Sequence, residues 1–291
     1  MTWKRVATAA VLVPVVVGLV LWGSTAIIAL AIALVTLLAL FEYFALGEAI
    51  GHRAYRFWTG TCALLLMFVQ WFASGGSTYG MPRRMTVRHE MDYLLGLSPT
   101  LPDVLFLFVI GVAVLTLFTR RPLVETLPAA GISSSGLVLV AFPLSFAIPL
   151  HAVRGQGPGL LLFAMVIVWM SDTAAYFAGR AIGRHPFAPK LSPKKTWEGA
   201  VAGFLASLAV AFAFAPWVNV PLVHLLTMAA LGNIAGQVGD LLESGYKRSA
   251  GIKDSGTLLP GHGGVLDRID ALILAIPVVW YYWILIYSPR S

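Results

Sequence analysis

The segment 240–270 gathers ionisable residues between two apolar runs. Ionisable groups are costly at membrane depth, so they usually line a polar cavity there and indicate function. Carboxylates suit a hard divalent cation, and lysine and arginine suit phosphate. The segment therefore indicates metal-assisted phosphate chemistry beside a membrane. Its charged residues and histidine are Asp240, Glu243, Lys247, Arg248, Lys253, Asp254, His262, Asp267, Arg268 and Asp270.

The spacing within this segment predicts two helices that face each other. Asp240, Glu243 and Lys247 recur at helical spacing, so they would line one face of a helix end. Asp267 and Asp270 would share a face of the next helix. Carboxylates from two helices can hold Mg²⁺ and leave positions open for substrate phosphates. The glycine turn at 261–264 would let the backbone approach a ligand. The alternative is an interhelical loop that only neutralises itself, through pairs such as Asp240–Lys247 and Asp267–Arg268.

A second polar region covers residues 171–199. Ser171 and Asp172 interrupt an apolar helix, and a basic loop follows. Ser192 and Pro193 predict an N-cap with proline at the first helical position. A helix starting there would direct its N–H groups toward a phosphate in the loop. The alternative is a stop-transfer loop, which explains the basic residues but not Asp172. The basic residues are Arg180, Arg184, Lys190, Lys194 and Lys195.

The composition is that of an integral membrane protein. The chain is 58% hydrophobic and 11% charged, whereas soluble domains carry about 25% charged residues. Apolar runs near the spanning length of about 20 residues predict an all-α fold with about nine transmembrane helices. We expect N-terminal membrane helices over 1–128 and a catalytic membrane region over 129–291, with the active-site cavity in the last helices. The expected spans are 6–22, 25–44, 57–73, 103–119, 132–150, 160–178, 199–216, 222–243 and 270–288.

The distribution of positive charge predicts the orientation. With the N-terminus inside, most of the 20 Lys and Arg residues fall on the cytoplasmic side, as the positive-inside rule requires. Both polar regions then face the cytoplasm, and the long loop at 74–102 lies outside. The net charge of +7 is explained by basic loops facing anionic lipid, so we expect no nucleic-acid partner. The lone Cys62 excludes an intrachain disulfide.

The carboxy-terminal motifs resemble the signature of the phosphatidate cytidylyltransferases (CDP-diacylglycerol synthases). One run is Ser244-x-x-Lys247-Arg248, and Lys253-Asp254-x-Gly256 follows it. The next is Leu259-Pro260-Gly261-His262-Gly263-Gly264-x-x-Asp267-Arg268-x-Asp270. The stretch from Ser171-Asp172-Thr173 to Ser192-Pro193-Lys194-Lys195-Thr196-x-Glu198-Gly199 resembles that family's second characteristic region. The resemblance covers about residues 160–290.

The resemblance implies a bacterial cytoplasmic-membrane enzyme that makes CDP-diacylglycerol and pyrophosphate from CTP and phosphatidic acid, expected as a homodimer. It implies that Asp240 and Asp267 hold Mg²⁺, with a second cation such as K⁺ nearby. The implied catalytic residues are Asp240, Lys247, Arg248, Asp267 and Asp270. The implied substrate-binding residues are Asp172, Lys194, Lys195, Ser244, Lys253, Asp254, His262, Gly263, Gly264 and Arg268.

Two other classes of protein explain the pattern less well. An anion transporter would place charge in broken helices of both halves, whereas here the charge gathers in the last 120 residues or so. Among other lipid phosphotransferases, the CDP-alcohol phosphotransferases carry a compact Asp-x-x-Asp-Gly motif, which this chain lacks. Dependence on CTP would separate these classes.

Overall fold

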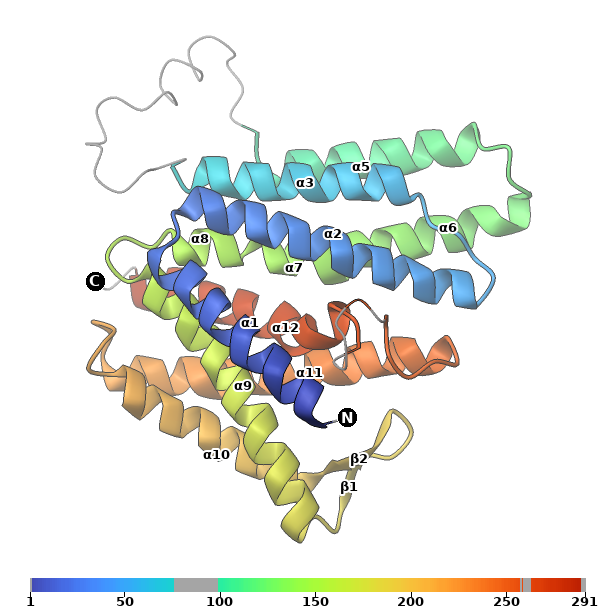
Figure 1. Ribbon diagram of the computed structural model, residues 1–291. Coiled ribbons are helices and arrows are strands. Elements are labelled where there is room, and N and C mark those ends of the chain that lie inside the picture. Colours follow the sequence, from blue (N-terminus) through green and yellow to red (C-terminus); the bar gives the residue numbers. More distant parts are fainter. Residues whose placement is uncertain (1, 76–98, 257, 259–262, 289–291) are drawn as a thin grey trace.

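The computed structural model describes residues 2–75, 99–256, 258 and 263–288 as a helical bundle with one β-hairpin (Figure 1). Most of the predicted loop at 74–102 lies outside the described residues, and so does His262. The helices of the first half are α1 (Thr2–Trp22), α2 (Thr25–Ala49), α3 (Arg56–Ala73), α5 (Leu101–Leu117), α6 (Leu123–Gly136), the π-helix η1 (Leu137–Ala141), α7 (Phe142–Ser145) and α8 (Ala147–His151).

The second half contains longer helices and the hairpin. Its elements are α9 (Gly157–Ile182), β1 (Pro186–Ala188), β2 (Ser192–Thr196), α10 (Trp197–Phe214), α11 (Leu222–Ser249), α12 (Leu266–Tyr282) and the π-helix η2 (Trp283–Tyr287). Strands β1 and β2 pair antiparallel. The chain is thus an all-α membrane protein, as predicted. Six helical segments are long and apolar enough to cross a membrane, and two shorter apolar helices accompany them among the described residues. The count of nine spans stays a prediction.

Capping residues explain where two of the apolar helices begin. Ser24 precedes α2 and accepts a hydrogen bond from the Ile27 amide. Asp103 lies in the first turn of α5 and accepts hydrogen bonds from the amide and hydroxyl of Thr100. Such caps satisfy N–H groups that have no partner within the helix. They therefore define where these two helices begin, which the uniformly apolar residues inside the helices do not.

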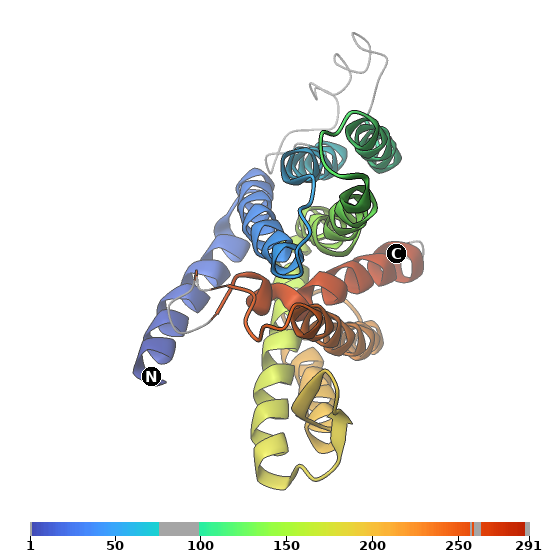
Figure 2. The same cartoon turned by 90° about the vertical axis from the view of Figure 1, so that its right-hand side faces the viewer.

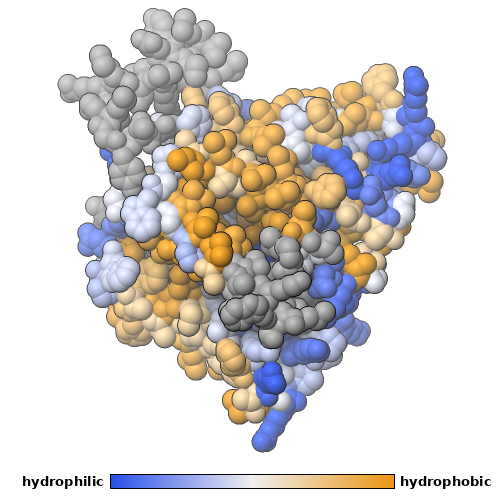
Figure 3. Space-filling view, in the orientation of Figure 1, coloured by the Kyte–Doolittle hydropathy of each residue, from blue (hydrophilic) through white to orange (hydrophobic). Residues whose placement is uncertain are grey.

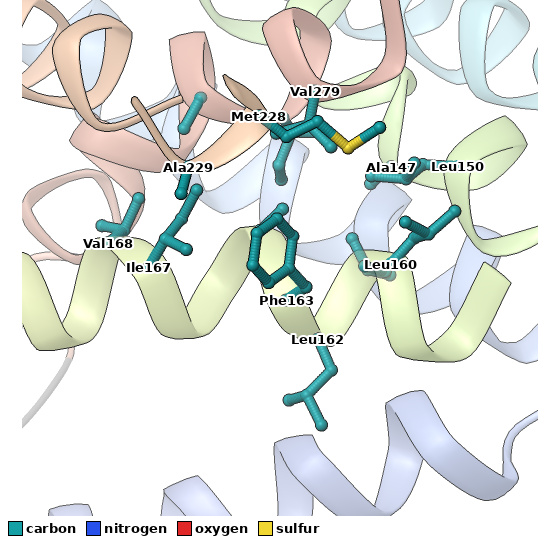
Figure 4. Close-up of a cluster of buried hydrophobic side chains, with 14 of the residues drawn as sticks. Ala147, Leu150, Leu160, Leu162, Phe163, Ile167, Val168, Met228, Ala229 and Val279 are labelled. Atoms are coloured by element: carbon teal, nitrogen blue, oxygen red, sulfur yellow. The ribbon is translucent and has the colours of Figure 1, made fainter. Parts of the chain in front are cut away.

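Two hydrophobic cores hold the bundle together. One core joins α2, α3, α5 and the segment from η1 to α8. The other gathers around α9, where Phe163 and Ile167 lie beside Met228 of α11 and Val279 of α12 (Figure 4). Val20 of α1 belongs to this second core, so the first helix packs against the carboxy-terminal region. The predicted division near residue 128 stays a prediction.

Glycines allow the helices of the second half to approach closely. A Cβ atom at Gly203 of α10 would lie 2.6 Å from the Ser171 hydroxyl of α9, and one at Gly239 of α11 would lie 2.5 Å from the Asp270 carbonyl of α12. Such distances are too short for any side chain, so glycine is required at both positions. These contacts bring the polar parts of α9, α11 and α12 together.

The polar loops lie at the two ends of the bundle (Figures 1 and 2). The hairpin and the segment after α11 lie at one end, where Arg248 contacts the Leu191 carbonyl. At the other end, the Gln156 side chain donates a hydrogen bond to the Asn219 carbonyl. Hydrophobic residues cover the middle of the face in Figure 3, and hydrophilic residues lie along its right-hand and lower edges. This arrangement suits a bundle embedded in a bilayer.

Candidate active site

Three aspartates from three helices approach one another. Asp172 of α9 interacts electrostatically with Asp240 of α11, and Asp270 of α12 interacts with both. The close packing at Gly239 brings α11 against α12 beside Asp270. Neighbouring carboxylates repel one another when ionised, so a bound cation or nearby basic groups would stabilise the cluster. The interaction of Asp240 with Asp270 joins the two helices of the carboxy-terminal segment, and Asp172 adds a carboxylate from the second polar region.

A buried polar network lies beside Asp172. The Asn233 side chain donates hydrogen bonds to Ser171 Oγ at 2.7 Å and to Ser207 Oγ at 2.8 Å. Gln237 donates to Asn233 Oδ1 at 2.7 Å. Buried polar groups that are fully paired hold their elements in one arrangement. The network therefore fixes α9, α10 and α11 relative to one another next to Asp172, which follows Ser171 in α9.

The hairpin supplies a basic side chain to this cluster. Lys195 of β2 forms an ion pair with Asp240, and both side chains are partly buried. The neighbouring Lys194 is exposed. Lys195 and Arg268 also interact electrostatically with Asp172. One cation of the basic loop thus lies within the carboxylate cluster, and Arg268 lies near it.

The predicted helix start at Ser192 and Pro193 is wrong. Both residues belong to strand β2, and α10 begins at Trp197. The N-cap is Thr196, whose hydroxyl accepts a hydrogen bond from the Gly199 amide at 3.2 Å. The fixed φ of proline is also tolerated in edge strands, so a Ser-Pro pair does not by itself mark a helix. The expected phosphate position at a helix start near 192 is therefore absent.

Lys247 lies between two carboxylates. Its Nζ is 2.5 Å from Glu243 Oε2 and 2.6 Å from Asp267 Oδ1, and its side chain is 12% exposed. Glu243 and Asp267 are more deeply buried. The predicted face of α11 is therefore present, and Lys247 connects it to α12. The Lys247–Asp267 pair joins α11 to α12, unlike the pairs of a self-neutralising loop, whereas the Glu243–Lys247 pair lies within α11.

Asp267 organises the loop that precedes α12. It lies in the first turn of that helix, three residues before the predicted start of the last span. Its Oδ2 accepts hydrogen bonds from the Ser255 amide at 3.0 Å and the Gly264 amide at 2.8 Å. Gly263 has a φ of +80°, and a Cβ there would lie 2.6 Å from Asp267 Oδ2. Gly263 is therefore needed to fold the loop around this carboxylate.

Arg248 donates hydrogen bonds to main-chain carbonyls. Its Nε donates to the Leu191 carbonyl and its Nη1 to the Ile252 carbonyl, both at 3.3 Å. The structure thus places it as a link between the hairpin and the end of α11. Among the other predicted residues, Ser244 is buried on α11, whereas Lys253, Asp254 and Arg268 are exposed at the same end of the bundle.

Glu42 is a buried polar residue that no motif in the sequence predicted. This residue of α2 is 2% exposed and accepts hydrogen bonds from Ser255 Oγ, the Val265 amide and the Leu266 amide at 2.8–2.9 Å. The signal was present, because an ionisable residue inside an apolar span is rare and usually functional. Glu42 belongs to no motif with the carboxy-terminal residues, so only the fold reveals its partners.

The carboxylates fit Mg²⁺ in their chemistry. Proteins usually bind this ion through one or two carboxylates, and water or substrate phosphate completes its shell. Within the described ranges, no three or more His, Cys, Asp or Glu residues form a ready metal cage. Glu243 Oε1 is buried and has no hydrogen-bond partner in the same part of the chain. A divalent cation bound mainly by one or two carboxylates and by substrate therefore suits the site.

Two bacterial proteins of the same name are similar in sequence to part of this chain. The Staphylococcus saprophyticus protein named phosphatidate cytidylyltransferase is 45% identical over 132 residues, which cover 45% of this chain and 51% of the relative. The Haemophilus influenzae protein of the same name is 44% identical over 136 residues, covering 44% of this chain and 46% of the relative. The chain therefore spans about half the length of the curated relatives that it matches. A family profile described as "Cytidylyltransferase family" matches residues 3–286, nearly the whole helical bundle, and the chain belongs to that family.

Proposed function

We propose that this protein transfers the cytidylyl group of CTP to phosphatidic acid and releases CDP-diacylglycerol and pyrophosphate. Relatives at about 45% identity carry the name of this activity. The observation that carries the proposal is the meeting of Asp172, Asp240 and Asp270 with Lys195 in a membrane bundle, with the ion pairs of Lys247 to Glu243 and Asp267 on the same two helices, α11 and α12. This is the combination that phosphate substrates and a cation require.

The reaction needs positioning and charge neutralisation rather than a covalent enzyme intermediate. An oxygen of the lipid phosphate forms a bond to the α-phosphorus of CTP. The bond from that phosphorus to the bridging oxygen of the β-phosphate breaks, and its electron pair leaves with pyrophosphate. Phosphatidic acid is already ionised at neutral pH, so no strong general base is needed. Lys195 and Lys247 would neutralise charge on the phosphates.

The proposed metal ligands are Asp240 and Asp267. When bound, Mg²⁺ would neutralise phosphate oxygens and hold them for in-line attack. Asp240 offers a partly exposed carboxylate. Asp267 Oδ1 contacts Lys247, a contact that anionic phosphates could replace by drawing the lysine toward themselves. Asp172 and Asp270 would support the site from the neighbouring helices. A second cation such as K⁺, and a homodimer, remain part of the proposal.

We further propose that the site faces the cytoplasm of a bacterium, because CTP is cytosolic. The hairpin and the segment after α11 lie at one end of the bundle, which lets both polar regions reach the same compartment. The excess of basic residues at this end agrees with the positive-inside rule.

Product formation by the purified protein tests the activity. The protein in detergent or lipid is given phosphatidic acid, CTP and Mg²⁺, and both pyrophosphate and the liponucleotide are measured. We expect equal amounts of the two products, and none when either substrate is omitted. The Asp240→Asn variant serves as the matched inactive protein. Pyrophosphate release without phosphatidic acid, or no liponucleotide with folded protein, would contradict the proposal.

A further inference from the structure

Glu42 is a buried carboxylate in the N-terminal half of the chain, whereas the candidate active-site residues lie in the second half. It lies on α2, and 2% of its surface is exposed. No ion pair includes it in the part of the chain that the structure describes. A buried carboxylate is costly unless hydrogen bonds satisfy it. The donors that satisfy Glu42 all come from the carboxy-terminal signature, more than 200 residues away in the sequence.

Two of these donors are backbone N–H groups at the start of α12. The Val265 amide donates to Glu42 Oε1 at 2.9 Å, and the Leu266 amide donates to Oε2 at 2.8 Å. No side chain of the helix's own N-cap residue makes a capping bond. The first N–H groups of a helix lack intrahelical partners, and negative charge is favourable there. Glu42 therefore caps α12 from another helix.

The glycines of the signature make room for this carboxylate. A Cβ at Gly256 would lie 2.5 Å from Glu42 Oε1, and a Cβ at Gly264 would collide with both Glu42 Oε2 and Ser255 Oγ. Any side chain at either position would displace Glu42. Gly256 and Gly264 thus have a defined partner inside the protein.

Ser255 connects Glu42 to the candidate active site. Its hydroxyl donates to Glu42 Oε2 at 2.9 Å, and its amide donates to Asp267 Oδ2 at 3.0 Å. Asp267 in turn contacts Lys247 at 2.6 Å. A continuous set of hydrogen bonds and an ion pair therefore runs from α2 to the basic residue of α11.

We propose that Glu42 is a positioning residue, which holds Ser255 and the first turn of α12 so that Asp267 meets Lys247. Its role in catalysis rests on the proposed function. Its effect on the structure does not, because the hydrogen bonds from Glu42 to Ser255 and to the start of α12 (the Glu42 clamp) can be tested without any reaction. In this proposal Glu42 contacts no reacting atom and acts through Asp267.

Hydrogen exchange tests the clamp directly. Glu42→Gln keeps the shape of the side chain but replaces one acceptor oxygen by a donor amide. We expect amides in peptides covering 255–268 to exchange about tenfold faster or more, with α9 and α10 unchanged. Glu48→Gln is the matched control, because Glu48 lies on the same helix in an exposed pair with Arg56. Unchanged exchange in Glu42→Gln would overturn the proposal, whether or not the protein shows cytidylyl transfer.

Kinetics tests whether the clamp serves the site. We expect Glu42→Gln to lower kcat about tenfold or more while KM for CTP changes less than about threefold, because the residue does not bind substrate. Glu48→Gln should retain both values. Normal kcat in Glu42→Gln would show that only the volume of the side chain matters, and would overturn the positioning role. If Glu42→Gln does not fold, Ser255→Ala removes the connecting hydroxyl alone. That variant should show the same exchange pattern more weakly, and its absence would count against the proposal.

Discussion

Lys195 on the β-hairpin forms an ion pair with Asp240 on α11, across 45 residues of sequence. The basic group beside the three aspartates thus comes from a short hairpin rather than from a helix of the bundle. Lys194 is the next residue, but its side chain is exposed. Alternation of side chains along a strand explains the difference between the two lysines.

Replacement of these two lysines should therefore have unequal effects. We expect Lys195→Ala to raise KM for CTP or lipid about tenfold, with a smaller fall in kcat, because charged hydrogen bonds contribute about 1.5–3 kcal/mol. Lys194→Ala should raise KM by no more than about threefold, as expected for a solvated charge. Steady-state kinetics at fixed ionic strength measures both. Equal effects would mean that the ion pair with Asp240 is not important for substrate binding.

Loss of either proposed metal ligand should remove most of the activity. Asp240→Asn and Asp267→Asn are each expected to lower kcat about a thousandfold. A carboxylate that binds Mg²⁺ would keep the ion where it neutralises the negative charge of the phosphates in the transition state. Chelation should abolish the activity of the unmodified protein, and Mg²⁺ should restore it. Size-exclusion chromatography checks that the variants fold. Full activity in one variant would remove that aspartate from the metal site.

Removal of Lys247 should destabilise the protein as well as inactivate it. Lys247→Met would leave Glu243 and Asp267 buried without their cation, and breaking a buried pair in this way costs about 3–5 kcal/mol. We expect a clearly lower Tm in detergent than for Arg248→Met, since Arg248 is exposed and its hydrogen bonds within the described residues are to backbone carbonyls. A Tm for Lys247→Met at or above that of Arg248→Met would contradict the buried placement of Lys247.

Two glycines should respond differently to an added methyl group. In Gly264→Ala the Cβ would collide with Glu42 and Ser255, so we expect activity to fall about tenfold or more with a lower Tm. Gly131 lies in α6, and a Cβ there meets nothing within 4 Å. Gly131→Ala should keep activity and gain about 0.5–1 kcal/mol from helix propensity. Similar behaviour of the two variants would argue against the packed turn.

The topology can be tested with an impermeant thiol reagent. In a Cys62→Ala background, cysteines at the exposed positions Lys190 and Lys253 should react only after cell lysis, and one at Arg154 should react in intact cells. Ser255 is unsuitable for this purpose, because it is buried and bonded to Glu42. Labelling of Lys190→Cys or Lys253→Cys in intact cells would place the site away from its nucleotide.

The sequence predicted the helices and the polar face of α11 because both depend on local patterns. Apolar runs of spanning length fixed the helices, and the spacing of Asp240 and Lys247 fixed one face of α11. The partners of those residues could not be predicted in the same way. Lys195 reaches Asp240 only because residues 192–196 form a strand, and Ser192-Pro193 is compatible with both strand and helix. Glu42 acquires its partners from a contact between the two halves, which no local pattern records.

Arg248 contacts two main-chain oxygens, that of Leu191 in the hairpin and that of Ile252 just after α11. A carbonyl oxygen is present whatever the side chain, so substitutions at these two positions should leave the contact intact. The number of residues between Ala188 and Ser192 matters more, because an insertion or deletion would move the Leu191 oxygen and shift Lys195 along its strand. Among homologous chains, the tip of this hairpin should therefore vary freely in amino acid but hardly at all in length.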